Sequence, residues 1–458
     1  MSDLPLRAVT RTAKLAALPL GFAGRTALGL GKKTIGRSAE AVANEIQTRT
    51  AEQLFKVLGE LKGGAMKFGQ VLSIFEAALP PEIAGPYRAT LTRLQESAPP
   101  MPVATVHRVL AESLGADWRA EFRSFDDKPA AAASIGQVHK AVWKDGREVA
   151  VKVQYPGAGK ALISDFNQLA RVGKLVGVLF PGADVKSILE ELKVRVREEL
   201  DYTVEAASQS AFAKAYADDP DFLVPEVVAQ SGTVLVTEWI YGTPLSQIIA
   251  KGAKAERDRA GLLFARFLFS APARCGHLHA DPHPGNFRLM EDGRLGVIDF
   301  GAVDRLEGGM QEEIGKLMRI GTLGSPEEII EACRTEGIIR DGVEVDGEAL
   351  AAFIEPLAVP MKAETFQFTR EWLRDQAARV TDLRPDNVVR YLNLPNDYVL
   401  VHRTIGLGTG VLCQLECEGP FRAEAIRWVK GFAPGEPTGE DAATGGPSAE
   451  PTAEPSAD

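Results

Sequence analysis

The chain has 458 residues, of which 45% are hydrophobic and 25% are charged, and its formal net charge is −10. This length and apolar content are enough for two or three domains or lobes with large cores. The acidic balance argues against a nucleic-acid binder, because such proteins need a basic face to meet phosphates.

The chain begins with a basic segment. Residues 1–37 contain seven basic side chains and one acidic side chain. Such a segment can be a surface-binding helix for anionic lipid or a solvated arm. No run reaches the 18 or so apolar residues of a membrane span, and no secretory cleavage signature is evident. The four cysteines are isolated or spaced as in a helix turn, so they do not form a disulfide framework. We therefore expect a cytoplasmic protein, peripherally membrane-associated if the basic segment binds lipid.

In the first half of the chain the spacing of apolar residues changes once, from that of helices to that of β-strands. Residues 38–61 have the 3- and 4-residue spacing of a helix, and a further helical region ends near residue 94. Residues 103–114 predict another short helix. Residues 138–143 and 148–154 are then β-branched runs separated by Lys144, Asp145 and Gly146, which indicates a β-hairpin.

The second half is predicted to be mostly helical. The expected elements, in chain order, are helices over 161–178 and 185–217, a strand over 233–239, a helix starting at 244–249, a helix over 259–277 kinked by Pro272, a hairpin of 286–289 with 295–298, and helices to residue 432. Residues 434–458 carry six carboxylates and are rich in proline and glycine, which predicts a disordered tail. Early strands and a helical second half predict a small lobe that contains strands and a larger helical lobe.

Three polar residues indicate phosphoryl-transfer chemistry. Asp281 and Asn286 lie five positions apart, and Asp299 follows a hydrophobic strand and precedes Phe300 and Gly301. Magnesium prefers oxygen ligands, which Asn286 and Asp299 would supply. Asp281 would place a carboxylate near the attacking oxygen.

The same loop allows a second interpretation. His277, His279, Asp281 and His283 could bind Zn²⁺ or a pair of metal ions. That interpretation leaves Asn286 and Asp299 without a role, and only one histidine follows the cluster. We therefore favour the phosphoryl-transfer interpretation and expect the histidines to orient the loop.

A lysine interrupts the strand pattern over 149–153. Lys152 occupies an inward-facing position, where an unpaired ammonium is costly. Glu205, on a downstream acidic helix, is the expected ion-pair partner, and the pair would hold Lys152 against the α- and β-phosphates of a nucleotide. A lysine that reaches water from a strand edge is the alternative.

These residues occur with motifs that ordinary kinases lack, and the sequence resembles the UbiB/ADCK family of atypical kinases. Lys67, Gly69 and Gln70 match the K-x-G-Q motif of the family, and Glu199 with Asp201 matches its E-x-D motif. Residues 130–139 match the alanine-rich loop that replaces a glycine-rich loop over the phosphates. The match extends from about residue 40 to about residue 420.

The resemblance implies an α+β, bilobal protein-kinase-like fold with an N-terminal helical extension. We expect five segments: a basic segment (1–37), a helical extension with the K-x-G-Q motif (38–115), a kinase-like N-lobe with the alanine-rich loop and the helices that bear the E-x-D motif (116–240), a helical C-lobe (241–432) and a disordered acidic tail (433–458).

The resemblance also assigns site residues. Catalytic roles fall to Asp281, Lys152 and Glu205, and Mg²⁺ would be bound by Asn286 and Asp299. ATP would contact Ala132, Ala133, Ser134, Gly136, Gln137 and Lys152, with the main chain of Glu238 and Ile240 at the adenine. Lys67, Gln70, Glu199 and Asp201 would form a regulatory cover that excludes protein substrates.

The implied function is that of a Mg-ATP-dependent ATPase or a kinase for a small or lipid-like acceptor, in a family tied to quinone and isoprenoid-lipid metabolism. Two alternatives stay open. An aminoglycoside-type phosphotransferase shares the His-x-Asp loop but lacks the K-x-G-Q motif. A pseudokinase scaffold would bind nucleotide without turning it over. The sequence identifies neither the acceptor nor the oligomeric state.

Overall fold

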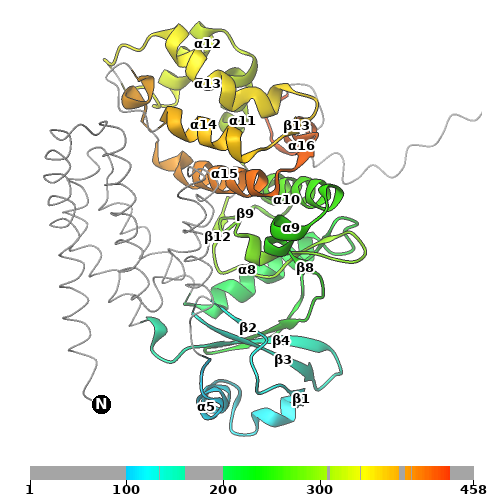
Figure 1. The fold of residues 1–458 in the computed structure, drawn as a ribbon. Coiled ribbons are helices and arrows are strands. Elements are labelled where there is room, and N and C mark those ends of the chain that lie inside the picture. The colour runs from blue at the N-terminus through cyan, green and yellow to red at the C-terminus, as the bar shows by residue number, and fades with distance from the viewer. Residues whose placement is uncertain are drawn as a thin grey trace, which may run out of the picture. The chain divides into compact units, whose positions relative to one another are not determined.

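A computed structural model describes residues 100–133, 135–159, 200–306, 310–340, 342–380, 387–393 and 395–433 (Figure 1). The chain divides into two compact units. Unit 1 comprises Met1–Ser210, Pro225–Tyr241 and Asp299–Ala302, and unit 2 comprises Ala211–Val224, Gly242–Ile298 and Val303–Asp458. The basic segment, the predicted helical extension as far as residue 99, the helix predicted over 161–178 and the tail from residue 434 lie outside the described residues.

Unit 1 contains a six-stranded antiparallel sheet with the order β1-β3-β4-β7-β6, in which β2 also pairs with β3. The strands are β1 (Phe122–Phe125), β2 (Ala131–Ala132), β3 (Gly136–Trp143), β4 (Glu148–Gln154), β6 (Val227–Ser231) and β7 (Val234–Glu238). The hairpin predicted over 138–154 and the strand predicted over 233–239 are thereby confirmed. The 3₁₀ helix η2 (Trp118–Glu121) leads into β1.

One helix packs on each face of this sheet (Figure 1). Helix α5 (Val103–Leu114), whose predicted bounds are confirmed, covers one face. The hydrophobic core between α5 and the sheet consists of apolar side chains from α5 and from alternate positions of β4, including Val106, Val109, Leu110, Val149, Val151 and Val153. Helix α8 (Tyr202–Ala215) packs on the other face, where Tyr202 and Ala206 contact the buried Leu235 of β7.

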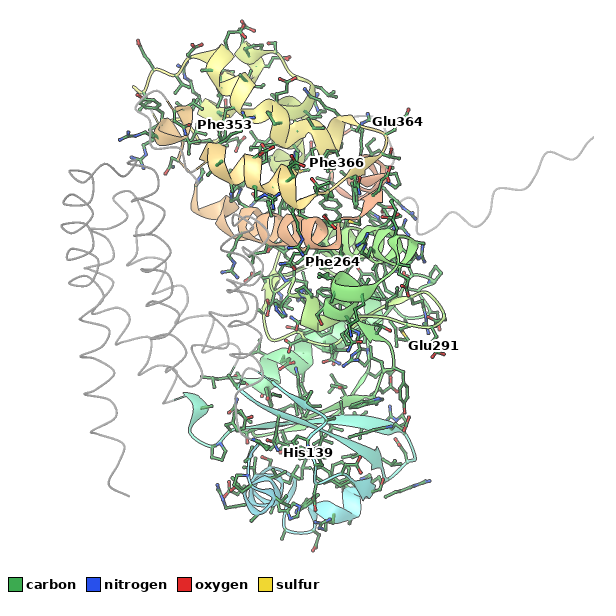
Figure 2. The ribbon with its side chains drawn as sticks, viewed as in Figure 1. His139, Phe264, Glu291, Phe353, Glu364 and Phe366 are labelled. Atoms are coloured by element: carbon green, nitrogen blue, oxygen red, sulfur yellow. The ribbon has the colours of Figure 1, made fainter. Side chains whose placement is uncertain are left out.

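A buried chain of hydrogen bonds through His139, which is labelled in Figure 2, ties the segment that precedes α5 to the sheet. The Met101 main-chain N–H donates to Gln137 Oε1 (2.7 Å), so the Gln137 amide nitrogen faces His139 Nε2 (2.8 Å). His139 Nδ1 lies 2.7 Å from the Asp126 carbonyl, which can only accept. His139 is therefore neutral, with its proton on Nδ1, and burial lowers its pKa from the ordinary 6.5.

Unit 2 contains two small sheets close to the predicted loop motifs. Strands β5 (Phe222–Leu223), β11 (Leu295–Val297), β10 (Phe287–Leu289) and β8 (Thr243–Pro244) form one sheet, and β9 (His277–His279) pairs with β12 (Val303–Arg305). The hairpin predicted over 286–298 is confirmed by the antiparallel pairing of β10 with β11. The helix predicted to extend to His277 ends at Cys275, because Gly276 adopts φ 66°, a left-handed conformation that stops helices.

Helices form the rest of unit 2. They are α9 (Leu245–Lys251), α10 (Lys254–Cys275), α11 (Glu312–Leu323), α12 (Pro326–Thr335), α13 (Gly347–Lys362), α14 (Arg370–Val380), η4 (Val388–Tyr391), α15 (Asn396–Leu415) and α16 (Phe421–Trp428). Helix α10 packs against α15 and α16. Strands β13 (Phe366–Gln367) and β14 (Glu418–Gly419) pair outside the predicted set. Among the described residues, no helix is both long and apolar enough to cross a membrane.

Candidate active site

Strand alternation brings Lys152 to the face of unit 1 that α8 covers. Val151 and Val153 point to the core with α5, so Lys152 between them points the other way. Its neighbour across the sheet is Leu235, which packs against α8. The predicted partner Glu205 lies on that helix, and Lys152 Nζ donates to Glu205 Oε1. The predicted ion pair is therefore present and buried, with side-chain exposures of 12% and 3%.

Asp299 is a second partner of the same lysine. Lys152 Nζ donates to Asp299 Oδ2 at 3.0 Å, and Asp299 Oδ1 accepts from the Gly301 main-chain N–H at 3.1 Å. Phe300 between them is buried and fixes the turn. Burial acts to lower the pKa of Lys152, but the negative charges of Asp299 and Glu205 outweigh it and raise the pKa, so the lysine is charged at neutral pH.

The donor atoms of this cluster suit a divalent cation. Two carboxylates, those of Glu205 and Asp299, contact the ammonium of Lys152. Asp299 is the more accessible of the two, with a side-chain exposure of 34%. Carboxylate oxygens are the ligands that Mg²⁺ prefers, and the site residues of unit 1 therefore fit a magnesium-bound phosphate.

The alanine-rich segment leads from β2 into the start of β3. Ala132 on β2 pairs with Gln137, and the Ala133 N–H donates to the Gly136 carbonyl at 2.9 Å. A Cβ at Gly136 would lie 2.3 Å from the Val153 carbonyl oxygen, so only glycine fits there. Ser134 lies outside the described residues.

Two sequence-predicted residues have other structural partners. The Gln137 side chain is 1% exposed and belongs to the buried chain with His139, so only its main chain faces the turn. Asp201 is exposed, and its Oδ1 accepts from the Thr203 N–H at 2.9 Å, which caps the start of α8. Lys67, Gln70 and Glu199, which the regulatory prediction also includes, lie outside the described residues.

The segment predicted to contact adenine ends strand β7. The Glu238 N–H donates to the Glu226 carbonyl, and the Trp239 N–H donates to the Glu148 carbonyl. The sheet thus uses these two donors before the chain reaches Ile240, which is buried. The contacts of Glu238 and Ile240 with adenine stay a prediction.

Unit 2 supplies the other predicted polar residues, on a loop that its own hydrogen bonds brace. The Asn286 side-chain amide donates to the Asp281 carbonyl at 3.1 Å, and the Asn286 N–H donates to the His283 carbonyl at 2.9 Å. The 3₁₀ helix η3 (Pro284–Asn286) is capped by His283 Nδ1, which accepts from Gly285. Because the Asn286 nitrogen is the donor, its amide oxygen is the end that can ligate a cation.

The neighbouring histidines have protein partners. His279 is fully buried, and its ring packs with those of Phe212, Phe267 and Phe287 at centroid distances of 5.5–6.4 Å. His277 Nδ1 donates to the Cys275 carbonyl at 2.6 Å. These contacts give both residues a structural role.

An antiparallel sheet with a buried lysine–glutamate pair, an Asp-Phe-Gly turn and a braced His-x-Asp loop are the features of a protein-kinase-like α+β domain. Residues 93–329, about half of the chain, match the model of the ABC1 atypical kinase-like domain. The chain belongs to this family, which confirms the predicted family and fold class.

Known relatives extend the match. The chain is 32% identical over 355 residues to the atypical kinase coq-8, mitochondrial, of Caenorhabditis elegans, with 74% of this chain and 46% of that protein covered. It is 34% identical over 310 residues to the chloroplastic protein ACTIVITY OF BC1 COMPLEX KINASE 3 of Arabidopsis thaliana, with 65% and 41% covered. The chain therefore spans less than half the length of these two relatives.

A solved structure is similar to a larger share of this chain. The Rv3197–erythromycin complex from Mycobacterium tuberculosis is 45% identical, with a TM-score of 0.66, and the match covers 86% of this chain and all of that chain. These matches do not favour the aminoglycoside-type alternative.

Proposed function

We propose that this chain binds Mg-ATP and either hydrolyses it or transfers its γ-phosphoryl group to a small or lipid-like acceptor. The observation that carries the proposal is the charged Lys152 between Glu205 and Asp299 in unit 1. A buried cation held by one enclosed and one accessible carboxylate is the arrangement that kinases use to orient phosphates and magnesium.

Each site residue has a role in this proposal. Lys152, oriented by Glu205, binds the α- and β-phosphates. Asp299 is the proposed Mg²⁺ ligand of unit 1, and the resemblance assigns a second Mg²⁺ ligand to Asn286 and a place near the attacking oxygen to Asp281. The turn with Ala132, Ala133, Ser134 and Gly136 covers the phosphates, and its alanines restrict the main chain more than glycines would. Gln137 contributes through its main chain alone.

The nature of the acceptor follows from the family resemblance. Lys67, Gln70, Glu199 and Asp201 would cover the site and exclude a polypeptide hydroxyl, which favours a small or lipid-like acceptor over protein. The family is tied to quinone and isoprenoid-lipid metabolism, so we propose a supporting role there. We also propose a cytoplasmic location with peripheral membrane contact through residues 1–37.

ATP turnover with and without Mg²⁺ tests the proposal. Asp299→Asn should abolish Mg-dependent turnover, because it removes the accessible carboxylate. Asp292→Asn is the matched control: Asp292 lies in the exposed β10–β11 turn and pairs with Arg294. Turnover by the Asp299→Asn variant at the wild-type rate would defeat the proposal. Vesicles of anionic phospholipid, with and without a quinone-like lipid, then show whether an acceptor or activator is lipid.

Nucleotide binding without turnover is the pseudokinase alternative. In that case ATP would raise the melting temperature of the wild type while no phosphate is released under any condition. The intact Lys152, Asp281, Asn286 and Asp299 favour the enzyme.

Macrolide binding is a second candidate. The Mycobacterium tuberculosis structure, 45% identical over its full length, is a complex with erythromycin. Erythromycin should then raise the melting temperature of this protein in a saturable manner, and no shift would exclude that property.

A further inference from the structure

Unit 2 contains a partly open apolar cavity that the kinase chemistry does not use. Its volume is about 440 Å³, within the range of small-molecule sites in proteins. Helices α10 to α15 supply most of its wall, and no described residue of that wall is Lys, Arg, Asp or Glu. All of these residues belong to unit 2, and Lys152, Glu205 and Asp299 belong to unit 1.

The cavity is built by small residues and by an irregular helix. Gly321 of α11 lies in the wall, where a larger side chain would fill the space, and Gly408 of α15 lets Leu268 of α10 approach closely. Helix α13 has prolines at 356 and 360, and Pro356 cannot donate to the Ala352 carbonyl one turn earlier. Arg379 of α14 donates to the carbonyls of Ala352 and Phe353 instead, at 2.7 and 3.1 Å. These hydrogen bonds from α14 hold α13 in position, and the cavity beside α13 stays unfilled.

The wall is adaptable and has unused hydrogen-bonding capacity. Met310, Met318 and Met361 line it, and methionine side chains adjust to ligands of different shape. Thr404, which is 1% exposed, and Trp372 also line it. Among the described residues, neither Thr404 Oγ1 nor Trp372 Nε1 has a hydrogen-bond partner. Buried polar atoms without partners are costly, as is an empty apolar cavity.

We propose that this cavity, defined by the α10–α15 wall, binds an uncharged, largely apolar small molecule with at least one oxygen acceptor. The apolar body replaces the missing packing partners of the wall. The oxygen accepts from Trp372 Nε1 or from Thr404, whose hydroxyl changes direction by a χ1 rotation. The described wall offers a charged ligand no Lys, Arg, Asp or Glu, and burial lowers the pKa of His402 in the wall, which keeps its ring neutral at pH 7.

Fluorescence titration with 6-propionyl-2-(dimethylamino)naphthalene, an uncharged apolar probe with a ketone oxygen, tests the site in the full chain. Gly321→Leu should fill the cavity, since a Cβ there meets only Ile354 Cγ2, at 3.5 Å. The control is Gly406→Leu, which adds the same group at an exposed position of α15 with open space around it. We expect saturable binding by the wild type and the control, and at least tenfold weaker binding by Gly321→Leu. Asp299→Asn should bind the probe as the wild type does, which separates this site from the ATP site.

A chemical readout keeps the test independent of any variant. Cys333 lies in the wall, whereas Cys275 does not. Saturating probe should slow N-ethylmaleimide modification of Cys333, followed by peptide mass spectrometry, and leave the rate at Cys275 unchanged. The proposal is wrong if the wild type shows no saturable probe binding. It is also wrong if the probe binds but neither Gly321→Leu nor Cys333 protection places it in the cavity.

Discussion

Glu205→Gln should destabilise unit 1 strongly, because it leaves a buried ammonium with one partner. Glu205 is 3% exposed and Lys152 is 12% exposed, so little solvent can screen the loss. Removing one member of a buried ion pair costs about 3–5 kcal/mol. Asp299 Oδ2 still lies 3.0 Å from Lys152 Nζ, so we expect the lower end, about 3 kcal/mol. For domains of roughly 150–250 residues this corresponds to a melting temperature lower by about 6–12 °C.

Thermal unfolding without nucleotide measures this effect. The matched control is Glu112→Gln, since Glu112 forms an exposed pair with Arg108 on α5 and such pairs contribute almost nothing to stability. The double variant Lys152→Met/Glu205→Leu should recover much of the loss, because both members of the buried pair are removed together and the Asp299 carboxylate, 34% exposed, stays in contact with solvent. Equal melting temperatures for the Glu205 and Glu112 variants would refute the reasoning, as would a double variant less stable than Glu205→Gln.

Acidification should destabilise unit 1, because burial lowers the pKa of folded His139 from 6.5 and the unfolded chain therefore takes up the proton first. Urea unfolding should show stability falling below about pH 6.5, and His139→Gln should reduce that slope; parallel curves would contradict this. In unit 2, Gly315→Ala should lower stability by about 3 kcal/mol, since its Cβ would lie 1.9 Å from the Lys430 carbonyl oxygen. Gly321→Ala on the same helix should leave the stability unchanged or raise it by up to about 1 kcal/mol. Equal melting temperatures for the Gly315→Ala and Gly321→Ala variants would contradict the packing argument.

Periodicity predicted several of the longer elements of the fold, but the helix predicted over 185–217 is wrong at residues 200 and 201, which are not helical and precede α8. The β-branched run over 148–154 has its two faces set by alternation, and the helix over 103–114 has the bounds expected from its pattern. Strands of two or three residues, such as β9 (His277–His279) and β12 (Val303–Arg305), are too short to show alternation. They form because each pairs with the other, and that pairing joins segments far apart in sequence.

Only part of the candidate site could be predicted from the sequence. The strand pattern indicated that Lys152 needs a partner, and an acidic helix offered Glu205. Spacing alone could not show that Asp299, 147 residues away, contacts the same lysine. Nor could it show that Gln137 is buried and accepts from the Met101 main chain, because the resemblance assigns a position in a motif and not the direction of its side chain.

Calorimetric titration of ATP into the protein, with Mg²⁺ and with a chelator, tests the central claim most directly. The account predicts saturable binding at one site per chain in the wild type, weakened without Mg²⁺. It predicts no binding by Lys152→Met/Glu205→Leu, a variant expected to fold but to lack the phosphate-binding ammonium. Absence of binding by the wild type, or equal affinity in the double variant, would contradict the assignment of unit 1 as the nucleotide-binding part of an atypical kinase.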